Sequence, residues 1–509
     1  MARLFRWSPL VLALALCMLP IKCLQAGERK AGSIESTVKT LHTTDGRSVR
    51  YEIGTLYVPE NRKVAHSRLI PVGFARIRSS GAAVGVPPVF WLPGGPGLSV
   101  LHDFEGKTES AQARVAMWER FTHVADVVII EQRGYTAMGE MLRANNSPLP
   151  LDEPETPAAK IRRYAALAEA ARKAYPAADL AGYTIAACAD DVDDLRHALG
   201  YRQISLFGGS FGSQWSMAVM RRHPDRVARA VLSGVEPLDN GYDMPSHVYA
   251  AMQRIAFDAD RDPGLAPWMP KGGLMAAVRV VRDRLAKAPV TIDLVDQATG
   301  KSQRVTLGVG DFQQFLVDNS SVADDWPALV LAIYYGHYTS WATSVARDRQ
   351  PSAVTLIGPL MDQSLGVSAA REFQMRTDPA LDMLGTWNFE PYLGSRSAWP
   401  TPDMGDELRL PVTTTIPVVF VHGDFDTSTP VENTLGLLPY FVRSHAIIVH
   451  RGGHDGTFYL LREDSGTKAA IYRFLGTGVM PELPSTIDAP KIVFTTPTFQ
   501  PSPQVADGH

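Results

Sequence analysis

Apolar and polar positions group into short apolar runs and longer segments with helical spacing. Apolar runs bounded by turn residues predict strands, and apolar positions three or four residues apart predict helices. The predicted strands are Ser48–Glu60, Ser67–Ser79, Val86–Leu92, Val124–Ile130, Ile204–Phe207, Val227–Val235, Ile416–His422 and His445–His450. The predicted helices among them are Glu109–Thr122, Pro157–Tyr175, Thr184–Leu199 and Phe211–Arg222. We expect the first two strands to pair antiparallel, and the alternation that follows indicates a mostly parallel sheet flanked by helices.

The alternation is interrupted between about Pro237 and Pro411, where helical segments are joined by loops rich in Pro and Gly. Helices are predicted there at Gly273–Lys287, Asp311–Val317 and Trp326–Trp341. We interpret this section as a mainly helical cap inserted into an α/β domain. The predicted organisation is a leader over 1–26, a core over 27–236 and 412–480, a cap over 237–411, and a tail over 481–509 with a candidate edge strand at Lys491–Phe499.

The first residues have the pattern of a secretory signal peptide. Arg3 and Arg6 precede the apolar run Ser8–Pro20, which is too short to span a bilayer comfortably. We expect cleavage after Ala26 and a secreted or periplasmic protein; an uncleaved membrane anchor is the alternative. Two of the three cysteines fall in this leader, so Cys188 is left without an internal disulfide partner and is expected to be a buried thiol.

Composition narrows the possible partners. The 509 residues exceed one ordinary core, which favours a large domain with an insertion. A net charge of -3 gives no reason to expect nucleic acid or, after leader cleavage, a membrane as partner. No Cys/His cluster has zinc spacing, so we expect no metal and no organic cofactor.

One turn carries the first candidate catalytic residue. Segment Gly208–Gly212 reads Gly-Gly-Ser-Phe-Gly between a predicted strand and a predicted helix. A strand that turns abruptly into a helix presents its central Ser as a nucleophile, and Gly on either side lets the two elements approach. We therefore predict Ser210 as the nucleophile; a plain glycine turn is the alternative.

A serine nucleophile needs a general base and a group that orients the base. Asp426 follows one predicted strand in a turn and is our choice for the orienting carboxylate, with Asp424 as its rival. His454 follows two Gly after the next strand and is our choice for the base, whereas His450 lies within the strand. The order Ser, acid, His, each beyond a strand end, is that of α/β-hydrolases.

An oxyanion requires fixed N–H donors. The N–H of Phe211, directly after the nucleophile, is one candidate. The other is expected in the loop Gly94–Gly97, where Pro96 has no N–H, so Gly95 is preferred and Gly94 is second. A simple tight turn is the alternative interpretation of this loop.

These motifs together resemble the prolyl iminopeptidase and tripeptidyl aminopeptidase family of α/β-hydrolases. They recur in family order between about Val86 and Phe474. The matching segments are Gly94–Gly97, Glu131–Gly134, Gly208–Gly212, Arg221–Val227, Gly423–Pro430 and Gly453-His454. The resemblance implies an α/β-hydrolase fold with a helical cap.

The same resemblance implies hydrolysis at the N-terminus of peptides, with cap carboxylates that bind the substrate's free amine. Which cap acids would do so stays open, and a solvated surface role is expected for Asp324, Asp325 and Glu372. Three features depart from the family pattern: Pro93 stands before the glycines, Glu131 replaces Asp, and Tyr135–Met138 replaces a short turn. We interpret them as changes near the mouth of the site.

The sequence thus predicts a serine aminopeptidase that works through an acyl-enzyme and releases N-terminal proline, other amino acids or short peptides. An esterase or amidase acting on non-peptide compounds is the nearest alternative, because a fold and a triad do not fix the leaving group. A non-catalytic binding protein on a hydrolase scaffold is the alternative from another class.

Overall fold

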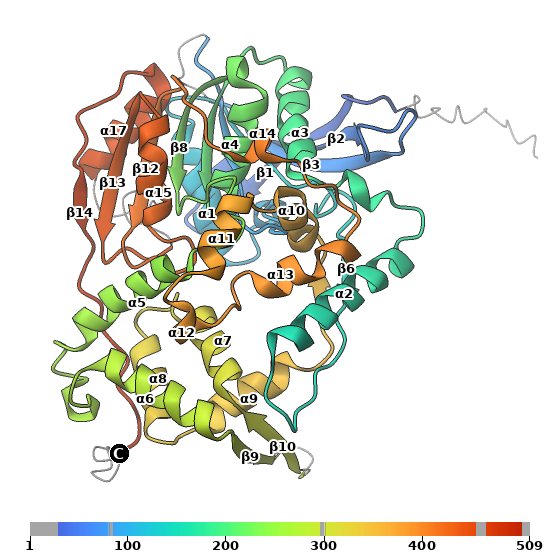
Figure 1. Cartoon of the computed structure of the whole chain (residues 1–509). Coiled ribbons are helices and arrows are strands. Elements are labelled where there is room, and N and C mark those ends of the chain that lie inside the picture. Colours follow the sequence, from blue (N-terminus) through green and yellow to red (C-terminus); the bar gives the residue numbers. More distant parts are fainter. Residues whose placement is uncertain are drawn as a thin grey trace, which may run out of the picture.

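The computed structural model describes residues 29–79, 81, 85–295, 300, 302–454 and 465–500. The expected leader and its cleavage site lie outside these residues. Within them, ten strands form one sheet in the order β1-β2-β3-β5-β4-β7-β8-β12-β13-β14 (Figure 1). The strands of this sheet are β1 (Ile34–His42), β2 (Ser48–Pro59), β3 (Leu69–Ile77), β4 (Val89–Leu92), β5 (Val127–Ile130), β7 (Ile204–Gly209), β8 (Val227–Ser233), β12 (Val418–Gly423), β13 (Ser444–His450) and β14 (Thr486–Asp488).

The direction of pairing changes at β5. Strands β1, β2, β3 and β5 pair antiparallel, whereas every pair from β5 through β4 to β14 is parallel. The antiparallel entry and the parallel sheet expected from the sequence are therefore confirmed, with β1 as an additional strand. Parallel strands need covering on both faces, which accounts for the continuous burial of β5 and β12.

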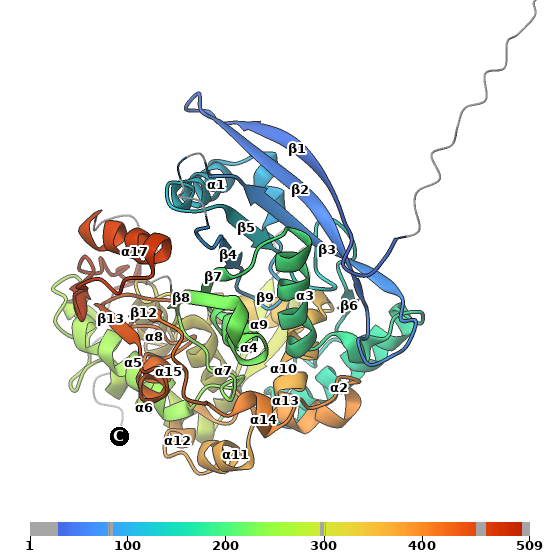
Figure 2. The ribbon, with the colours of Figure 1, turned by 90° about the horizontal axis from the view of Figure 1, so that it is seen from above.

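Helices cover the sheet on both faces (Figure 2). Helices α3 (Ile185–Ala198) and α4 (Phe211–Arg222) pack into one core cluster with the sheet, and α1 (Glu109–Phe121) and α17 (Ser465–Thr477) into another. Helix α3 begins where its sequence predicts, because Thr184 accepts a hydrogen bond from the Ala187 N–H at 3.2 Å. Cys188, on this helix, is fully buried.

The inserted region between β8 and β12 has its own hydrophobic core, below the sheet in Figure 1. Its helices are α5 (Pro245–Ala259), α6 (Leu274–Lys287), α7 (Val309–Asn319), α8 (Trp326–Tyr334), α9 (Thr339–Asp348), α10 (Ile357–Leu365), α11 (Ala369–Arg376), α12 (Leu381–Leu384), α13 (Glu390–Ser395) and α14 (Asp406–Arg409). It also holds a hairpin of β9 (Val290–Val295) and β10 (Ser302–Leu307). Helix α15 (Glu432–Leu437) follows β12.

A segment from before the nucleophile turn joins this inserted region. Strand β6 (Arg143–Asn145) pairs with β11 (Ala353–Thr355), and α2 (Pro157–Ala174) packs against α13. The hydroxyls of Tyr164 and Tyr392 from these two helices lie 3.3 Å apart. The cap side is thus built from two stretches of chain, although both β6 and α2 fall within the first core segment expected from the sequence.

Two predicted elements differ in the structure. The helix expected over Trp326–Trp341 is two helices, α8 and α9, because Gly336 adopts a φ of +85° that a continuing helix does not allow. The edge strand expected at Lys491–Phe499 does not form there. The edge strand is β14, which precedes it, while the Phe499 carbonyl accepts a hydrogen bond from the Trp268 indole at 2.8 Å.

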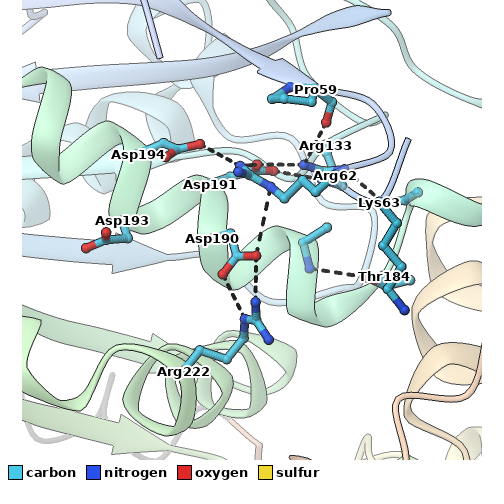
Figure 3. Close-up of polar contacts among 12 residues, drawn as sticks. Pro59, Arg62, Lys63, Arg133, Thr184, Asp190, Asp191, Asp193, Asp194 and Arg222 are labelled. Carbon is cyan, nitrogen blue, oxygen red and sulfur yellow. Dashed lines mark hydrogen bonds and ion pairs between the residues drawn. The ribbon is translucent and has the colours of Figure 1, made fainter. Parts of the chain in front are cut away.

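A buried ion-pair network fixes the start of α3 and the loop after β5 (Figure 3). The Arg133 guanidinium is fully buried and binds Asp191 through Nε at 2.8 Å and Nη2 at 2.6 Å. Its Nη1 donates to the carbonyls of Glu60 and Gly182. Arg62 reaches the same carboxylate at 2.5 Å. These bonds tie the Gln-Arg-Gly segment to α3 and to the residues just before this helix.

Candidate active site

The predicted nucleophile occupies a sharp turn between β7 and α4. Ser210 has φ 55° and ψ −134°, a conformation rarely adopted by residues other than Gly. A Cβ at Gly208 would lie 2.2 Å from the Gly212 carbonyl oxygen, and one at Gly212 would lie 2.1 Å from that of Leu92. Only glycine fits at both positions, so the sequence pattern and the strained turn have the same steric cause.

The predicted acid and base are hydrogen bonded to each other. Nδ1 of His454 lies 2.8 Å from Oδ2 of Asp426. Thr429 supports the pair, because its hydroxyl donates to the same Oδ2 at 2.8 Å. The backbone N–H groups of Ser428 and Thr429 donate to the other carboxylate oxygen at 2.9 and 2.8 Å. This arrangement holds Asp426 so that it can orient the imidazole.

The carboxylate of Asp426 is buried yet favours its charged form. Burial alone would raise its pKa, but hydrogen bonding with His422 and His454 holds the pKa of this carboxyl well below its usual range. Nε2 of His422 lies 3.5 Å from Asp426 and 2.5 Å from the Thr429 carbonyl oxygen. An ionised Asp426 is what stabilises an imidazolium at His454.

The rival residues form a pair of their own. Nδ1 of His450 lies 2.8 Å from Oδ2 of Asp424, whose other oxygen accepts the Arg451 N–H at 2.8 Å. The loop after β12 therefore directs two acids to two different histidines. The geometry favours Asp426 over Asp424 as the partner of His454.

Ser210 and His454 both border the end of β8. The N–H of Ser210 donates to the Ser233 carbonyl oxygen at 3.0 Å. The next residue, Gly234, packs against the histidine, since a Cβ there would lie 3.2 Å from Cε1 of His454 and 3.3 Å from its Nδ1. The three predicted catalytic residues thus follow the carboxyl ends of the parallel strands β7, β12 and β13, and two of them lie beside the end of β8.

The glycine loop after β4 lies directly beside the nucleophile. A Cβ at Gly94 would lie 3.3 Å from Cβ of Ser210 and 3.8 Å from its Oγ. Within the described part of the chain, the N–H groups of Phe211, Gly94 and Gly95 have no acceptor. The loop therefore brings free donors to the serine, and both glycines stay open as the second donor.

Gln132 fixes this loop and was not singled out from the sequence. Its Oε1 accepts the Gly97 N–H at 2.5 Å, and its Nε2 donates to the Gly94 carbonyl at 3.0 Å. The neighbouring Glu131, expected near the mouth, is instead fully buried. It accepts the N–H groups of Val100, Leu101 and Ala137 at 2.7 to 3.0 Å. The side chains of both residues stabilise the loops around the nucleophile through these hydrogen bonds.

Three carboxyls that the sequence did not single out lie near the triad: Asp243 and Asp362 line one pocket, and both act on Glu236. Burial and the neighbouring acids Asp243, Asp362 and Asp426 raise the pKa of Glu236 well above its usual value. Burial also raises the pKa of Asp243 and that of Asp362 to about 7. We call Glu236, Asp243 and Asp362 the acid cluster. The N–H of Glu236 donates to the Ser213 hydroxyl at 2.9 Å, one turn from the nucleophile.

Two members of the acid cluster line a small cavity in the cap. Asp243 and Asp362 line a pocket of about 200 Å³ together with the aromatic residues Tyr242, Trp387 and Tyr392. The cap acids considered from the sequence lie elsewhere. Glu372 pairs with Arg376 at 2.9 Å. Asp324 and Asp325 contact Thr495 in the tail. Glu236 follows a strand end, a signal that could have marked it, whereas the two aspartates carry no local motif.

Among the described residues, no group of three or more His, Cys, Asp or Glu side chains is placed to hold a metal ion. Within the same residues, no helix combines the length and the apolar character that a membrane crossing needs.

Comparison with known proteins agrees with the fold. Residues 87–265 match the family profile described as alpha/beta hydrolase fold, and residues 390–487 match the profile described as TAP-like protein. Together the two matches span more than half of the chain. No curated protein sequence matches significantly.

Similar solved structures come from several hydrolase types. The proline iminopeptidase of Mycobacterium smegmatis matches with 13% identity and a TM-score of 0.39 over 83% of this chain and 97% of its own. An esterase from Exiguobacterium antarcticum matches with 12% identity and a TM-score of 0.34 over 87% and 100%. Epoxide hydrolase A of Mycobacterium thermoresistibile matches with 14% identity and a TM-score of 0.32 over 87% and 99%. Likenesses this distant carry no argument about the substrate.

The sheet order, the nucleophile turn and the first profile define an α/β-hydrolase. The TAP-like match in the last third of the chain narrows this class. The two matches together are consistent with the prolyl iminopeptidase and tripeptidyl aminopeptidase-like hydrolases that the motifs resemble.

Proposed function

We propose that this α/β-hydrolase is a serine aminopeptidase that removes N-terminal residues or short peptides. The observation that carries the proposal is the acid cluster next to the Ser210, Asp426 and His454 arrangement. A free N-terminus carries a positive charge at neutral pH, and enclosed carboxylates are the groups that bind it. A site for simple esters has no use for three enclosed acids.

The acid cluster supports this role because nearby cations do not fully neutralise its negative charge. The cation that most stabilises the charged form of Asp243 is Arg371, and the amide of Asn433 donates to the same carboxylate at 3.5 Å. Asp362 is affected by burial alone. Burial disfavours the charged form of each carboxyl, and Asp243 and Asp362 add to the rise in the pKa of Glu236. A bound ammonium group would relieve that cost. The substrate amine supplies this missing charge.

The proposed reaction is acyl transfer in two steps. The Ser210 oxygen attacks the scissile carbonyl carbon while Nε2 of His454 takes the hydroxyl proton. Asp426 stabilises the resulting imidazolium, and the N–H of Phe211 with a donor from Gly95 or Gly94 binds the oxyanion. His454 returns the proton to the leaving amine, which departs. Water then attacks the acyl-enzyme by the same route and restores Ser210.

A substrate panel tests the proposal. We expect cleavage of aminoacyl-, prolyl- or tripeptidyl-arylamides with free N-termini and little cleavage of the same compounds after N-acetylation. In Asp243→Asn protein the preference for free amines should shrink, while Glu372→Gln, a surface acid of the cap, should leave it unchanged. The esterase alternative would be favoured if short acyl esters were cleaved and the arylamides, with free or N-acetylated N-termini, were not.

The catalytic nature of the site needs a test that does not depend on the substrate. A fluorophosphonate probe reacts with activated serines irrespective of the acyl group. We expect it to label Ser210 in folded protein. Absence of labelling in a protein with an intact thermal transition would favour a non-catalytic binding role.

We also propose that the protein is exported. The basic residues Arg3 and Arg6 and the apolar run Ser8–Pro20 support this location. N-terminal sequencing of the protein expressed with its leader in a Gram-negative host should give a mature chain that starts at Gly27. An intact N-terminus in the membrane fraction would instead favour the anchor.

A further inference from the structure

A second pocket lies outside the catalytic site. It encloses about 530 Å³ between α4, α11, α14 and α15, and none of Ser210, Asp426 and His454 lines it. Met217 and Met220 from α4 and Leu437 from α15 form its apolar walls. Pockets for small organic ligands enclose roughly 300 to 1,000 Å³. The size and lining therefore suit a ligand with an apolar portion.

One end of the pocket carries a guanidinium without a carboxylate partner. Arg371, on α11, donates from Nη2 to the Tyr242 carbonyl at 3.0 Å. Within the described chain, no acidic side chain lies within ion-pair distance of it, and Asp243, Asp239 and Glu236 act on it only at longer range. Its Nε is buried with no hydrogen-bond acceptor among the described residues. An arginine stays charged under all ordinary conditions. A partly buried charge of this kind favours an anionic ligand.

The acids that line the same pocket are already engaged. Asp239 accepts the N–H and the hydroxyl of Ser368 at 2.7 and 2.6 Å. Glu432 is paired with Arg254. A second cation, Arg221, donates to the Glu407 carbonyl and has no carboxylate partner among the described residues. Ser368 is neutral, so Asp239 keeps its negative charge. Arg371 and Arg221 together outnumber this one acid that has no ion pair, so the lining keeps an excess of positive charge.

The mouth of the pocket is apolar and exposed. Leu410 is 43% exposed and Val412 is 44% exposed, and both line the pocket. Val442, 60% exposed, is hydrogen bonded to Thr414 in the same lining. An apolar mouth that leads to a buried cation matches a ligand with a charged head and an aliphatic tail.

We propose that this pocket binds an amphipathic monocarboxylate whose head group pairs with Arg371 and whose tail lies along Met217, Met220 and Leu437. Two sources share this chemistry: a medium-chain fatty acid, and the C-terminus of an apolar peptide.

Occupation of the pocket would affect the acid cluster, and this consequence rests on the proposed function. Arg371 favours the charged forms of Asp243 and Glu236. A carboxylate bound to Arg371 would cancel that effect and leave the acid cluster less ionised. Affinity for a substrate amine would then fall. The ligand would thus act as an inhibitor that raises KM for free-amine substrates.

Binding can be tested on the full chain carrying Ser210→Ala, so that turnover plays no part. Isothermal titration calorimetry with decanoate should show one site, and decylamine, with the same tail and opposite charge, should not bind there. Arg371→Gln should weaken decanoate binding about tenfold or more, as expected for a lost charged hydrogen bond. Arg376→Gln, on the same helix but paired with Glu372 and Glu390, should change nothing.

A second variant keeps the proposal testable if Arg371→Gln protein does not fold. Val412→Asp places a negative charge at the exposed mouth and should also weaken decanoate binding. Binding of N-acetyl-Leu-Leu, but not of its C-terminal amide, would identify a peptide C-terminus as the source of the carboxylate. Binding of decanoate without binding of N-acetyl-Leu-Leu would identify a fatty acid. Three results would each overturn the proposal. They are equal binding of decanoate and decylamine, unchanged affinity for decanoate in both folded variants, and no binding of either carboxylate at millimolar concentration.

A kinetic measurement tests the coupling separately. In wild-type enzyme, decanoate should raise KM for a free-amine arylamide and leave p-nitrophenyl acetate hydrolysis unchanged. An equal effect on both substrates would refute the coupling. If the enzyme cleaves no amine substrate, the aminopeptidase proposal fails, while the calorimetric result on the pocket stands by itself.

Discussion

Nδ1 of His454 lies 2.8 Å from Oδ2 of Asp426, whereas Asp424, two residues earlier in the same loop, binds His450 at the same distance. This pairing predicts very different outcomes for two similar substitutions. Asp426→Asn should lower kcat by about 10⁴-fold, because the amide no longer fixes the imidazole tautomer. Asp424→Asn should retain activity within a few-fold. Steady-state kinetics on both folded variants check this, and equal losses would contradict the assignment.

Ser210→Ala should abolish turnover while the fold persists. The expected loss in kcat is on the order of 10⁶-fold, because acyl transfer then lacks its nucleophile. Covalent labelling by a fluorophosphonate should disappear as well. Ser216→Ala is a matched control, since its hydroxyl only donates to the Gly212 carbonyl in the same helix. Near-normal turnover or labelling in Ser210→Ala protein would exclude Ser210 as the nucleophile.

Gln132 should affect the rate more than substrate binding. Gln132→Ala removes both hydrogen bonds that hold the loop Gly94–Gly97 beside the nucleophile. A displaced oxyanion donor costs roughly 10²-fold in kcat. We expect a loss of this size with KM changed much less. Gln203→Ala is the control, because it also removes two hydrogen bonds, an exposed one to the Asp225 carbonyl and an exposed one from Arg202. A large change in KM alone would indicate a role in binding.

The sequence predicted the parts of the site that have a local steric cause. The turn around Ser210 requires Gly at both ends because backbone atoms approach within about 2 Å of a hypothetical Cβ, and such a constraint leaves a readable pattern. The loops that carry Asp426 and His454 each follow an apolar strand, so their position at one sheet edge follows from parallel topology.

The acid cluster could not be predicted in the same way. Glu236, Asp243 and Asp362 come from the loop after β8, the start of the cap and helix α10, and they meet only through the tertiary fold. Their raised pKa values depend on enclosure by cap helices, which no short motif encodes. The edge strand β14 was likewise decided by packing. The break at Gly336, by contrast, has a local signal, because glycine is the residue that adopts the positive φ seen there.

The buried network in Figure 3 predicts an asymmetric effect on stability. Asp191 is fully buried and binds both Arg133 and Arg62, so Asp191→Asn leaves a buried guanidinium uncompensated. We expect a loss of about 3 to 5 kcal/mol in the free energy of unfolding. Asp194, on the same helix with a side chain 34% exposed, pairs only with Arg62, and Asp194→Asn should cost less than about 1 kcal/mol. Urea denaturation measures both, and similar values would contradict the prediction.

The raised pKa values of Asp243 and Asp362, both about 7, predict how the pH should affect selectivity. As the pH falls through 7 these carboxyls take up protons and lose the charge that binds a substrate ammonium group, which itself stays protonated. Hydrolysis of p-nitrophenyl acetate shares the dependence on His454 but has no amine. The ratio of kcat/KM for a free-amine arylamide to that for the ester should therefore fall more than about tenfold between pH 7 and pH 5. Asp243→Asn should lower the ratio at pH 7 and flatten its pH dependence, while Glu372→Gln should leave the profile as in wild type. A ratio that is constant across this range would mean that the acid cluster does not bind the substrate amine.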